Sequence, residues 1–268
     1  MRRSSNGWAH PRDLALAMEG RRVVPEGSGE RFAGYGIPGL PFASGHVLAF
    51  RRMTASGLGV PYTTVWHRDP GGAWTIFGDV EPERACPRYF GSALQRIIPE
   101  GVELSWEGPL DASLRVPEVR LQWGIRLARD ASTVGLSAAA RLLPRSLWER
   151  ERVAEALGRF GGRILGLGKL SLGGRVPNGH RFWMAPRGLW RVAASAAVLD
   201  GEDLGVLGPL PKQVRMADFW IPNRGILAFG EASFERQCGP SRRVRRKATT
   251  GQRKEIEHHG RFFDEGSG

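Results

Sequence analysis

The chain has 268 residues, of which 41% are hydrophobic and 25% charged, and its formal net charge is +12. This composition is typical of a globular protein and excludes a fibrous or wholly disordered chain. Two cysteines, Cys86 and Cys238, are too few for a disulfide framework, so we expect free thiols in a reducing cytoplasm. No apolar run reaches the ~18 residues of a membrane span, and the polar segment 1–7 does not resemble a signal peptide.

The first thirty residues mix Arg, Gly, Pro and Ser, which predicts a loosely ordered N-terminal arm over residues 1–30. We expect the folded domain to occupy residues 31–235. Near its start, residues 34–41 contain three glycines and two prolines. Because both residue types weaken a central strand, this segment is predicted to be a structured loop or a lid.

After residue 45 the apolar residues alternate with polar ones. Residues 46–50, 62–67 and 74–77 are short, rich in β-branched and aromatic side chains, and separated by turn residues. The sequence Asp-Pro-Gly-Gly at residues 69–72 predicts a tight hairpin turn between the second and third of these strands.

Three more strands are predicted at residues 102–107, 112–116 and 119–127. In the last of them, alternation predicts one face in a core and one face in water. The apolar face would carry Val119, Leu121, Trp123, Ile125 and Leu127, and the polar face Arg120, Gln122 and Arg126.

One helix is predicted near residues 146–158, where Ser146 and Glu149 can form a capping box and Gly158 can end the helix. The strand pattern resumes at residues 180–185, 189–199, 214–221 and 226–234. The predicted fold class is therefore all-β, or β-dominated α+β: an antiparallel barrel or sandwich with one inserted helix.

Several of these segments resemble the lipocalin-like β-barrel proteins of the carotenoid hydratase and tocopherol cyclase type. The similarity rests on the hairpin from Trp66 to Trp74, on Trp106 and Trp123 in the strands of residues 102–127, and on the Asn-Gly pair at residues 178–179. The resemblance implies a barrel with a cavity for an apolar ligand. It transfers no catalytic residue to this chain.

Histidines in predicted strands are the candidate catalytic groups, because a pKa near neutrality suits general acid or base chemistry. His46 shares a strand face with Leu48 and Phe50, and His180 shares one with Phe182 and Met184. His67 could form a base and orienting carboxylate with Asp79 on the neighbouring strand. The alternatives are buried histidines satisfied by hydrogen bonds, and a cross-strand surface contact for His67.

Nine tryptophans are present, and most lie in or beside predicted strands. Core packing accounts for most of them, but several could line a pocket for a flat or polyene-like ligand. No His-x-His or Cys-x-x-Cys spacing indicates a metal site, and no motif indicates a cofactor. The candidate ligand-binding residues are Phe50, Tyr62, Trp66, Phe182 and Met184.

Residues 236–268 hold nine Lys or Arg against four acidic residues, so they carry +5 of the net charge. We predict a disordered basic tail. Its basic run could attract nucleic acid through phosphate contacts, but the lack of interleaved aromatic residues favours a solubilising role. The candidate nucleic-acid contacts are Arg242, Arg243, Arg245, Arg246 and Lys247.

The leading hypothesis is a protein that binds a hydrophobic small molecule in a β-barrel cavity, either as a carrier or as a cofactor-independent isomerase, hydratase or cyclase. The alternative is a nucleic-acid-associated module that uses the basic tail. A third hypothesis is an accessory protein without chemistry of its own.

Overall fold

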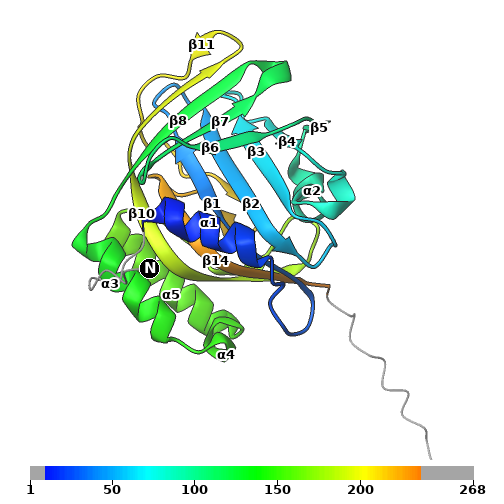
Figure 1. Ribbon diagram of the computed structural model, residues 1–268, viewed down its shortest axis with the longest axis vertical. Helices are drawn as coiled ribbons and strands as arrows, with labels where there is room; N and C mark the ends of the chain where they lie inside the picture. The colour runs from blue at the N-terminus through cyan, green and yellow to red at the C-terminus, as the bar shows by residue number, and fades with distance from the viewer. Residues whose placement is uncertain (1–9, 237–268) are drawn as a thin grey trace, which may run out of the picture. The chain divides into compact units, whose positions relative to one another are not determined.

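The computed structural model describes residues 10–236, which form a β-dominated domain (Figure 1). Its helices are α1 (Pro11–Arg21), α2 (Pro87–Phe90), α3 (Ala131–Leu142), α4 (Arg145–Trp148) and α5 (Glu151–Leu165). Its strands are β1 (Glu30–Pro41), β2 (Val47–Ser56), β3 (Tyr62–Arg68), β4 (Trp74–Gly78), β5 (Arg96–Pro99), β6 (Glu103–Trp106), β7 (Asp111–Val116), β8 (Leu121–Ala128), β9 (Gly173–Arg175), β10 (Arg181–Leu199), β11 (Glu202–Asp203), β12 (Arg215–Met216), β13 (Phe219–Trp220) and β14 (Ile226–Glu235).

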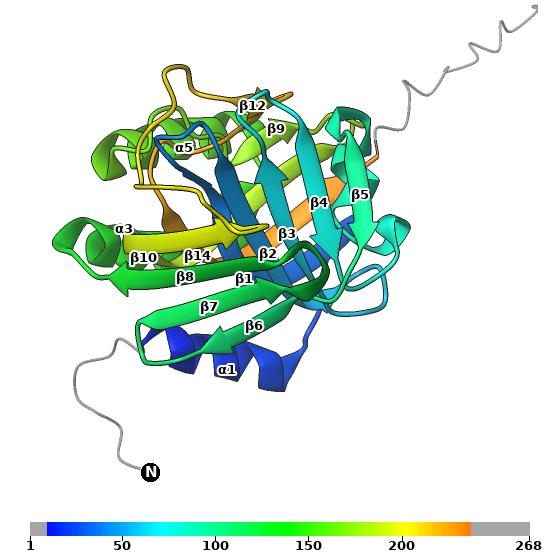
Figure 2. The same cartoon turned by 90° about the horizontal axis from the view of Figure 1, so that it is seen from above.

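Most of the strands belong to one sheet with the order β5-β4-β3-β2-β1-β14-β10-β8-β7-β6, while β9 and β11 also pair with β10. Neighbouring strands are antiparallel except for β4 and β5, which run parallel. The sheet curls into a half-barrel (Figure 2). The predicted β-dominated, barrel-like architecture is confirmed, and the parallel pair is an addition to it.

The hairpin between β3 and β4 forms as the turn residues predict. The Asp69 side chain accepts a hydrogen bond from the Ala73 N–H at 2.9 Å, and the Gly72 N–H donates to the Asp69 carbonyl at 3.0 Å. Gly72 has a φ of 101°, which explains why glycine is needed there. This turn fixes the β3–β4 register.

From Leu121 onward, strand β8 follows its predicted alternation, with Leu121, Trp123, Ile125 and Leu127 buried and Gln122 and Arg126 exposed. The prediction that the strand begins at Val119 is wrong, because Pro117–Val119 form a 3-10 turn that Arg120 closes with a φ of 50°. Its buried face contributes to the largest hydrophobic cluster, which we call the main core. Other members of the main core are Tyr35, Ile37, Leu48, Phe50, Val65, Leu114, Trp190 and Phe229.

The prediction of a loop or lid at residues 34–41 is wrong, because β1 runs through this segment to Pro41. Glycine is required by close strand approach here: a Cβ on Gly34 would lie 2.1 Å from the Arg52 carbonyl oxygen, and one on Gly36 would lie 2.2 Å from that of Phe50. The β1–β2 register shifts between Ile37 and Leu40, and this irregularity accommodates Pro38.

The single predicted helix at residues 146–158 is replaced by the set α3, α4 and α5, which lie together beside β10 and β14 (Figure 1). The capping box forms at Asp130 and Thr133 at the start of α3, not at Ser146. Gly158 lies inside α5, where a Cβ would meet the Leu170 carbonyl oxygen at 2.4 Å, so it serves close packing. The helix ends instead at Gly166, with a φ of 65°.

Helix α1 forms within the segment expected to be a loosely ordered arm. Ala15 is buried against the main core, and Glu19 accepts two hydrogen bonds from the Arg52 guanidinium at 2.7 Å. A helix of this length is marginal in isolation, so this docking accounts for its presence.

Candidate functional site

A cavity of about 230 Å³ lies on the face of the central strands that is turned away from the main core. On β1, Tyr35 and Ile37 point into the main core, so the alternate residues Gly34 and Gly36 face the cavity. The volume is slightly below the range of roughly 300–1,000 Å³ typical of pockets for drug-sized ligands. A slender ligand would fit such a space.

The floor of the cavity is made of residues with little or no side chain. Gly34 is paired with Gly230 and Gly36 with Ala228 across β1 and β14, and Ala232 continues the strip along β14. Larger side chains at these central positions would fill the space. The glycines that allow close strand approach therefore also leave the floor bare.

Two rows of residues cross this floor from β2 to β10. One row runs Arg51, Gly36, Ala228, Leu189, and the other runs Met53, Gly34, Gly230, Pro186. Four strands at ~4.8 Å spacing give a floor roughly 14 Å wide. Arg51 and Leu189 thus mark opposite ends of one row.

Helices α3 and α5 cover the floor. Four large side chains line the cavity from this side: Leu136 of α3, Leu143 directly after α3, and Leu157 and Phe160 of α5. Ala139 of α3 and Phe160 of α5, which also line the cavity, are exposed to solvent. The walls include Phe90, Phe182, Phe219 and Met184. Methionine side chains adapt readily to ligands of different shape.

The polar residues at the β2 end of the cavity are Arg51, Tyr62 and Cys86. The Tyr62 hydroxyl lies 3.5 Å from the Cys86 sulfur. Burial raises the pKa of both the Tyr62 hydroxyl and the Cys86 thiol, so both are neutral at pH 7. The Arg51 guanidinium lies over the Trp66 ring at 5.1 Å and over the Phe219 ring at 5.6 Å.

Three of the five predicted ligand-binding residues, Tyr62, Phe182 and Met184, line the cavity. Trp66 is fully buried behind Arg51 rather than in the lining. Phe50 belongs to the main core and contacts Trp123 edge to face. Residues 48 and 50 of β2 face the main core, while residues 49, 51 and 53 face the other side, so Phe50 does not border this cavity.

The predicted catalytic histidines do not meet in this cavity. His46 and His67 form a pair with 2.8 Å between His46 Nδ1 and His67 Nε2. Both lie on the strand face that carries Leu48 in the main core. The Asp79 side chain accepts a hydrogen bond from the Thr63 N–H at 2.8 Å, and the β3–β4 register sets Thr75 opposite His67. The expected His67–Asp79 pair is therefore not formed.

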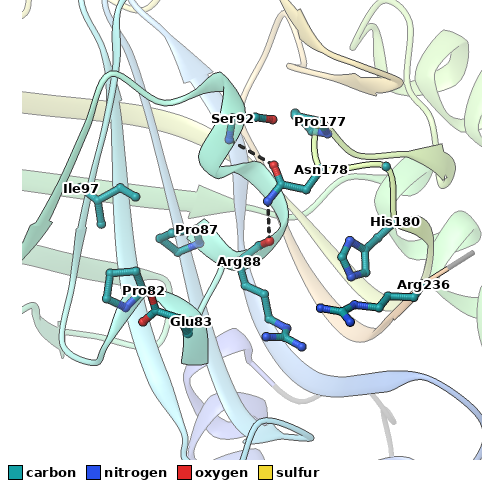
Figure 3. A pocket seen from close by; sticks show the side chains of 11 residues that line it. Pro82, Glu83, Pro87, Arg88, Ser92, Ile97, Pro177, Asn178, His180 and Arg236 are labelled. Atoms are coloured by element: carbon teal, nitrogen blue, oxygen red, sulfur yellow. Dashed lines mark hydrogen bonds between the residues drawn. The ribbon is translucent and has the colours of Figure 1, made fainter.

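His180 lines a separate, open depression of about 950 Å³ (Figure 3). It is 9% exposed and contacts the Tyr89 ring edge to face, and neither ring nitrogen has a hydrogen-bond partner among residues 10–236. Asn178 fixes the rim, since its side chain accepts from the Ser92 N–H at 3.1 Å and donates to the Arg88 carbonyl at 2.7 Å. This depression is more polar than the cavity.

The candidate nucleic-acid contacts, Arg242, Arg243, Arg245, Arg246 and Lys247, lie outside the described residues. Within residues 10–236, no group of three or more His, Cys, Asp or Glu is arranged to hold a metal ion. The helices in the same range are too short or too polar to cross a bilayer.

Sequence reasoning missed Arg51 and Cys86 as site residues. The available signal was strand alternation: Ala49, Arg51 and Met53 follow one another on one face of β2, so an arginine had to lie on a face shared with apolar residues. Which face borders a cavity depends on where α3 and α5 pack, and that contact is not local in sequence.

No protein-family model, curated protein or solved structure matches this chain in the comparisons made.

Proposed function

We propose that this protein binds an apolar small molecule in the cavity between its central strands and helices α3 and α5. The observation that carries the proposal is the bare strip of Gly34, Gly36, Ala228 and Gly230 in the middle of a sheet, roofed by leucine and phenylalanine side chains. Ligand pockets are mostly apolar, with a few polar groups that fix orientation. Arg51, Tyr62 and Cys86 supply such groups.

The location differs from the interior of a barrel. Large side chains of the main core, including Phe50, Trp123 and Trp190, fill the inner face of the described half-barrel. The proposed site is on the opposite face. The proposal includes the resemblance to lipocalin-like proteins that the sequence suggests, and this resemblance supports an apolar ligand.

Binding, rather than catalysis, is the activity that the site supports. His46 and His67 contact the other face of the sheet, and His180 lines a different depression. Tyr62 and Cys86 are neutral at pH 7, so neither supplies a charged base or nucleophile. Isomerase, hydratase and cyclase activities stay hypotheses, because the described residues that line the cavity include no side chain suited to catalyse them.

Calorimetric titration with decanol, an uncharged apolar chain, tests this proposal. We expect binding by the wild-type protein and a loss of about tenfold or more, which is 1.4 kcal/mol, in Ala228→Phe, because the new ring fills the floor. Ala196→Phe is the matched control, since Ala196 is exposed on β10. Native mass spectrometry of freshly purified protein would add the identity of a bound molecule. Equal decanol affinity in all three proteins would contradict the proposal.

The nucleic-acid alternative depends on residues outside the described range, and it stays a prediction. Binding to DNA or RNA that weakens steeply with salt, and that is lost on truncation after Glu235, would support it.

A further inference from the structure

Arg51 lies in the wall of an apolar cavity. Within the described residues, no carboxylate lies within ion-pair distance of its guanidinium. Six of the eight other buried or half-buried arginines within the described range have one: the pairs are Arg31–Glu149, Arg52–Glu19, Arg88–Glu30, Arg145–Glu231, Arg181–Glu151 and Arg191–Asp130. The other two, Arg68 and Arg187, donate to backbone carbonyl oxygens and do not line the cavity through an apolar wall as Arg51 does. A buried charge without a partner is costly, so its presence calls for a reason.

The groups beside Arg51 do not neutralise it. Cys86 and Tyr62 are the titratable groups that act electrostatically on Arg51, and burial keeps both protonated by raising the pKa of each. Glu231 lines another part of the cavity, but its carboxylate is held by Arg145. Desolvation without a compensating anion lowers the pKa of the Arg51 guanidinium, yet arginine remains charged at neutral pH.

Part of the guanidinium has a structural task. Nη1 donates to the carbonyl oxygens of Ile37 at 2.7 Å and of Phe50 at 2.9 Å, and Nη2 donates to that of Pro38 at 3.3 Å. The first and last of these carbonyls belong to the irregular segment of β1, where the register with β2 shifts. Arg51 therefore supplies donors to a part of the strand with a broken hydrogen-bond ladder.

The rest of the guanidinium is available. Nε donates to no described residue, and Nη2 has a second N–H. The same two atoms hold carboxylates elsewhere in this protein: Nε and Nη2 of Arg52 bind Glu19, and those of Arg88 bind Glu30. Arg51 thus presents an unused fork that matches the two oxygens of a carboxylate.

We infer that the ligand is an apolar chain bearing one carboxylate, which pairs with Nε and Nη2 of Arg51 while the chain lies across the glycine and alanine floor toward Leu189. This inference rests on the proposed function and names its ligand class. The row from Arg51 through Gly36 and Ala228 gives the chain a path bounded by apolar walls. A single carboxylate balances the single positive charge, whereas a phosphate dianion would bring a second charge, for which the described lining residues hold no further cation.

A comparison of three ligands with the same chain tests the inference: decanoate, decanol and decylamine, titrated by calorimetry into the full-length protein. We expect decanoate to bind about thirty-fold more tightly than decanol, or more. This ratio corresponds to the lower end of the free energies measured for buried charge pairs. Decylamine should bind most weakly, because its positive charge would face that of Arg51. In Arg51→Met, decanoate should fall to the affinity of decanol. Arg51→Lys should keep part of the preference, because it retains the charge but not the fork.

Arg52→Met is the matched control, since Arg52 is adjacent in sequence but faces Glu19 and the main core side. It should leave the ratio of decanoate to decanol affinity unchanged. If Arg51 only fastens β1, its replacement would change stability and leave this ratio at the wild-type value. Should Arg51→Met not fold, the wild-type and Arg51→Lys ratios still decide the matter.

The outcomes separate the two proposals. Equal binding of decanol and decanoate by the wild-type protein would overturn the carboxylate assignment and leave the apolar site in place. Failure of all three ligands to bind would overturn the apolar site itself.

Discussion

The imidazole Nδ1 of His46 lies 2.8 Å from Nε2 of His67, and the two rings stack with their centroids 5.1 Å apart. Only one of the facing nitrogens can carry a proton in this contact. The pair joins the residue before β2 to β3, next to the hairpin turn at residues 69–72.

Stability should fall as the pH drops from about 6.5 toward 4. Burial, together with the charge of His46, lowers the pKa of His67 from 6.5 to about 4. Between these values the unfolded chain binds a proton that the folded protein does not, so protonation favours unfolding. The effect should reach roughly 2 kcal/mol at most once solvent screening is included. This loss of stability is measured by urea denaturation across the pH range for wild type, His67→Gln and the exposed control His10→Gln. If the unfolding free energy of His67→Gln fell as steeply as that of wild type, the assignment to His67 would be contradicted.

Replacing Asp130 should loosen the helix that roofs the cavity. The Asp130 carboxylate accepts hydrogen bonds from the Ser132 hydroxyl at 2.5 Å and the Thr133 N–H at 2.8 Å, and it pairs with Arg191 at 2.7 Å. Asp130→Ala should cost about 1–2 kcal/mol of unfolding free energy, whereas Asp130→Asn, which keeps a capping oxygen, should cost less. Thermal and urea unfolding of both variants check the order.

The same carboxylate should contribute to acid sensitivity. Hydrogen bonds from Ser132 and Thr133, with the charge of Arg191, hold the pKa of Asp130 below its usual value. The ionised carboxylate stabilises the folded protein at pH values above the unfolded-state pKa, and this stabilisation is lost as the pH falls below that value. The stability gap between wild type and Asp130→Asn should therefore narrow in acid, and a gap that is constant with pH would refute this.

Adding a methyl group to the cavity floor should destabilise the sheet. A Cβ at Gly34 would lie 2.1 Å from a backbone oxygen, so Gly34→Ala should lower the unfolding free energy by about 2 kcal/mol or more. Gly101→Ala is the control, because nothing lies within 4 Å of its Cβ position, and it should change stability by no more than about 0.5 kcal/mol. Similar unfolding midpoints for the two variants would show that β1 and β2 can separate without cost.

Cys86 should react slowly with thiol reagents in the folded protein. Its side chain is buried, and burial raises the pKa of the thiol, so little thiolate is present at pH 8. In a Cys238→Ser background, labelling by dithionitrobenzoate should be at least about tenfold slower in the native state than in urea. Decanoate should slow it further, because Cys86 borders the same end of the cavity as Arg51. If native Cys86 were labelled as fast as it is in urea, its burial in the cavity wall would be contradicted.

The parts of the fold that were predictable from the sequence are those set by local pattern. The turn at residues 69–72 and the alternation in β8 depend on residues adjacent in sequence, and both formed as expected. Strand β1 was missed because its glycines and Pro38 weaken a strand locally, while contacts with both neighbouring strands stabilise it. Helix α1 depends on its docking to the main core in the same way.

The candidate site was only partly predictable. Tyr62, Phe182 and Met184 were expected to contact a ligand, and they do line the cavity. The position of Arg51 beside a bare floor depends on the pairing of β1 with β14 and on helices that begin 80 or more residues later in the chain. A single sequence holds no local signal for such a long-range arrangement.

The bare floor also determines where ligand preference can change during evolution or engineering. Gly34, Gly36 and Gly230 cannot take larger side chains without pushing neighbouring backbone aside, so the lower boundary is fixed. Ala139 and Phe160, on exposed positions of α3 and α5, are free of that restriction. Homologous or designed variants that accept longer or shorter molecules should therefore differ in the helical cover, while the strands beneath it stay constant.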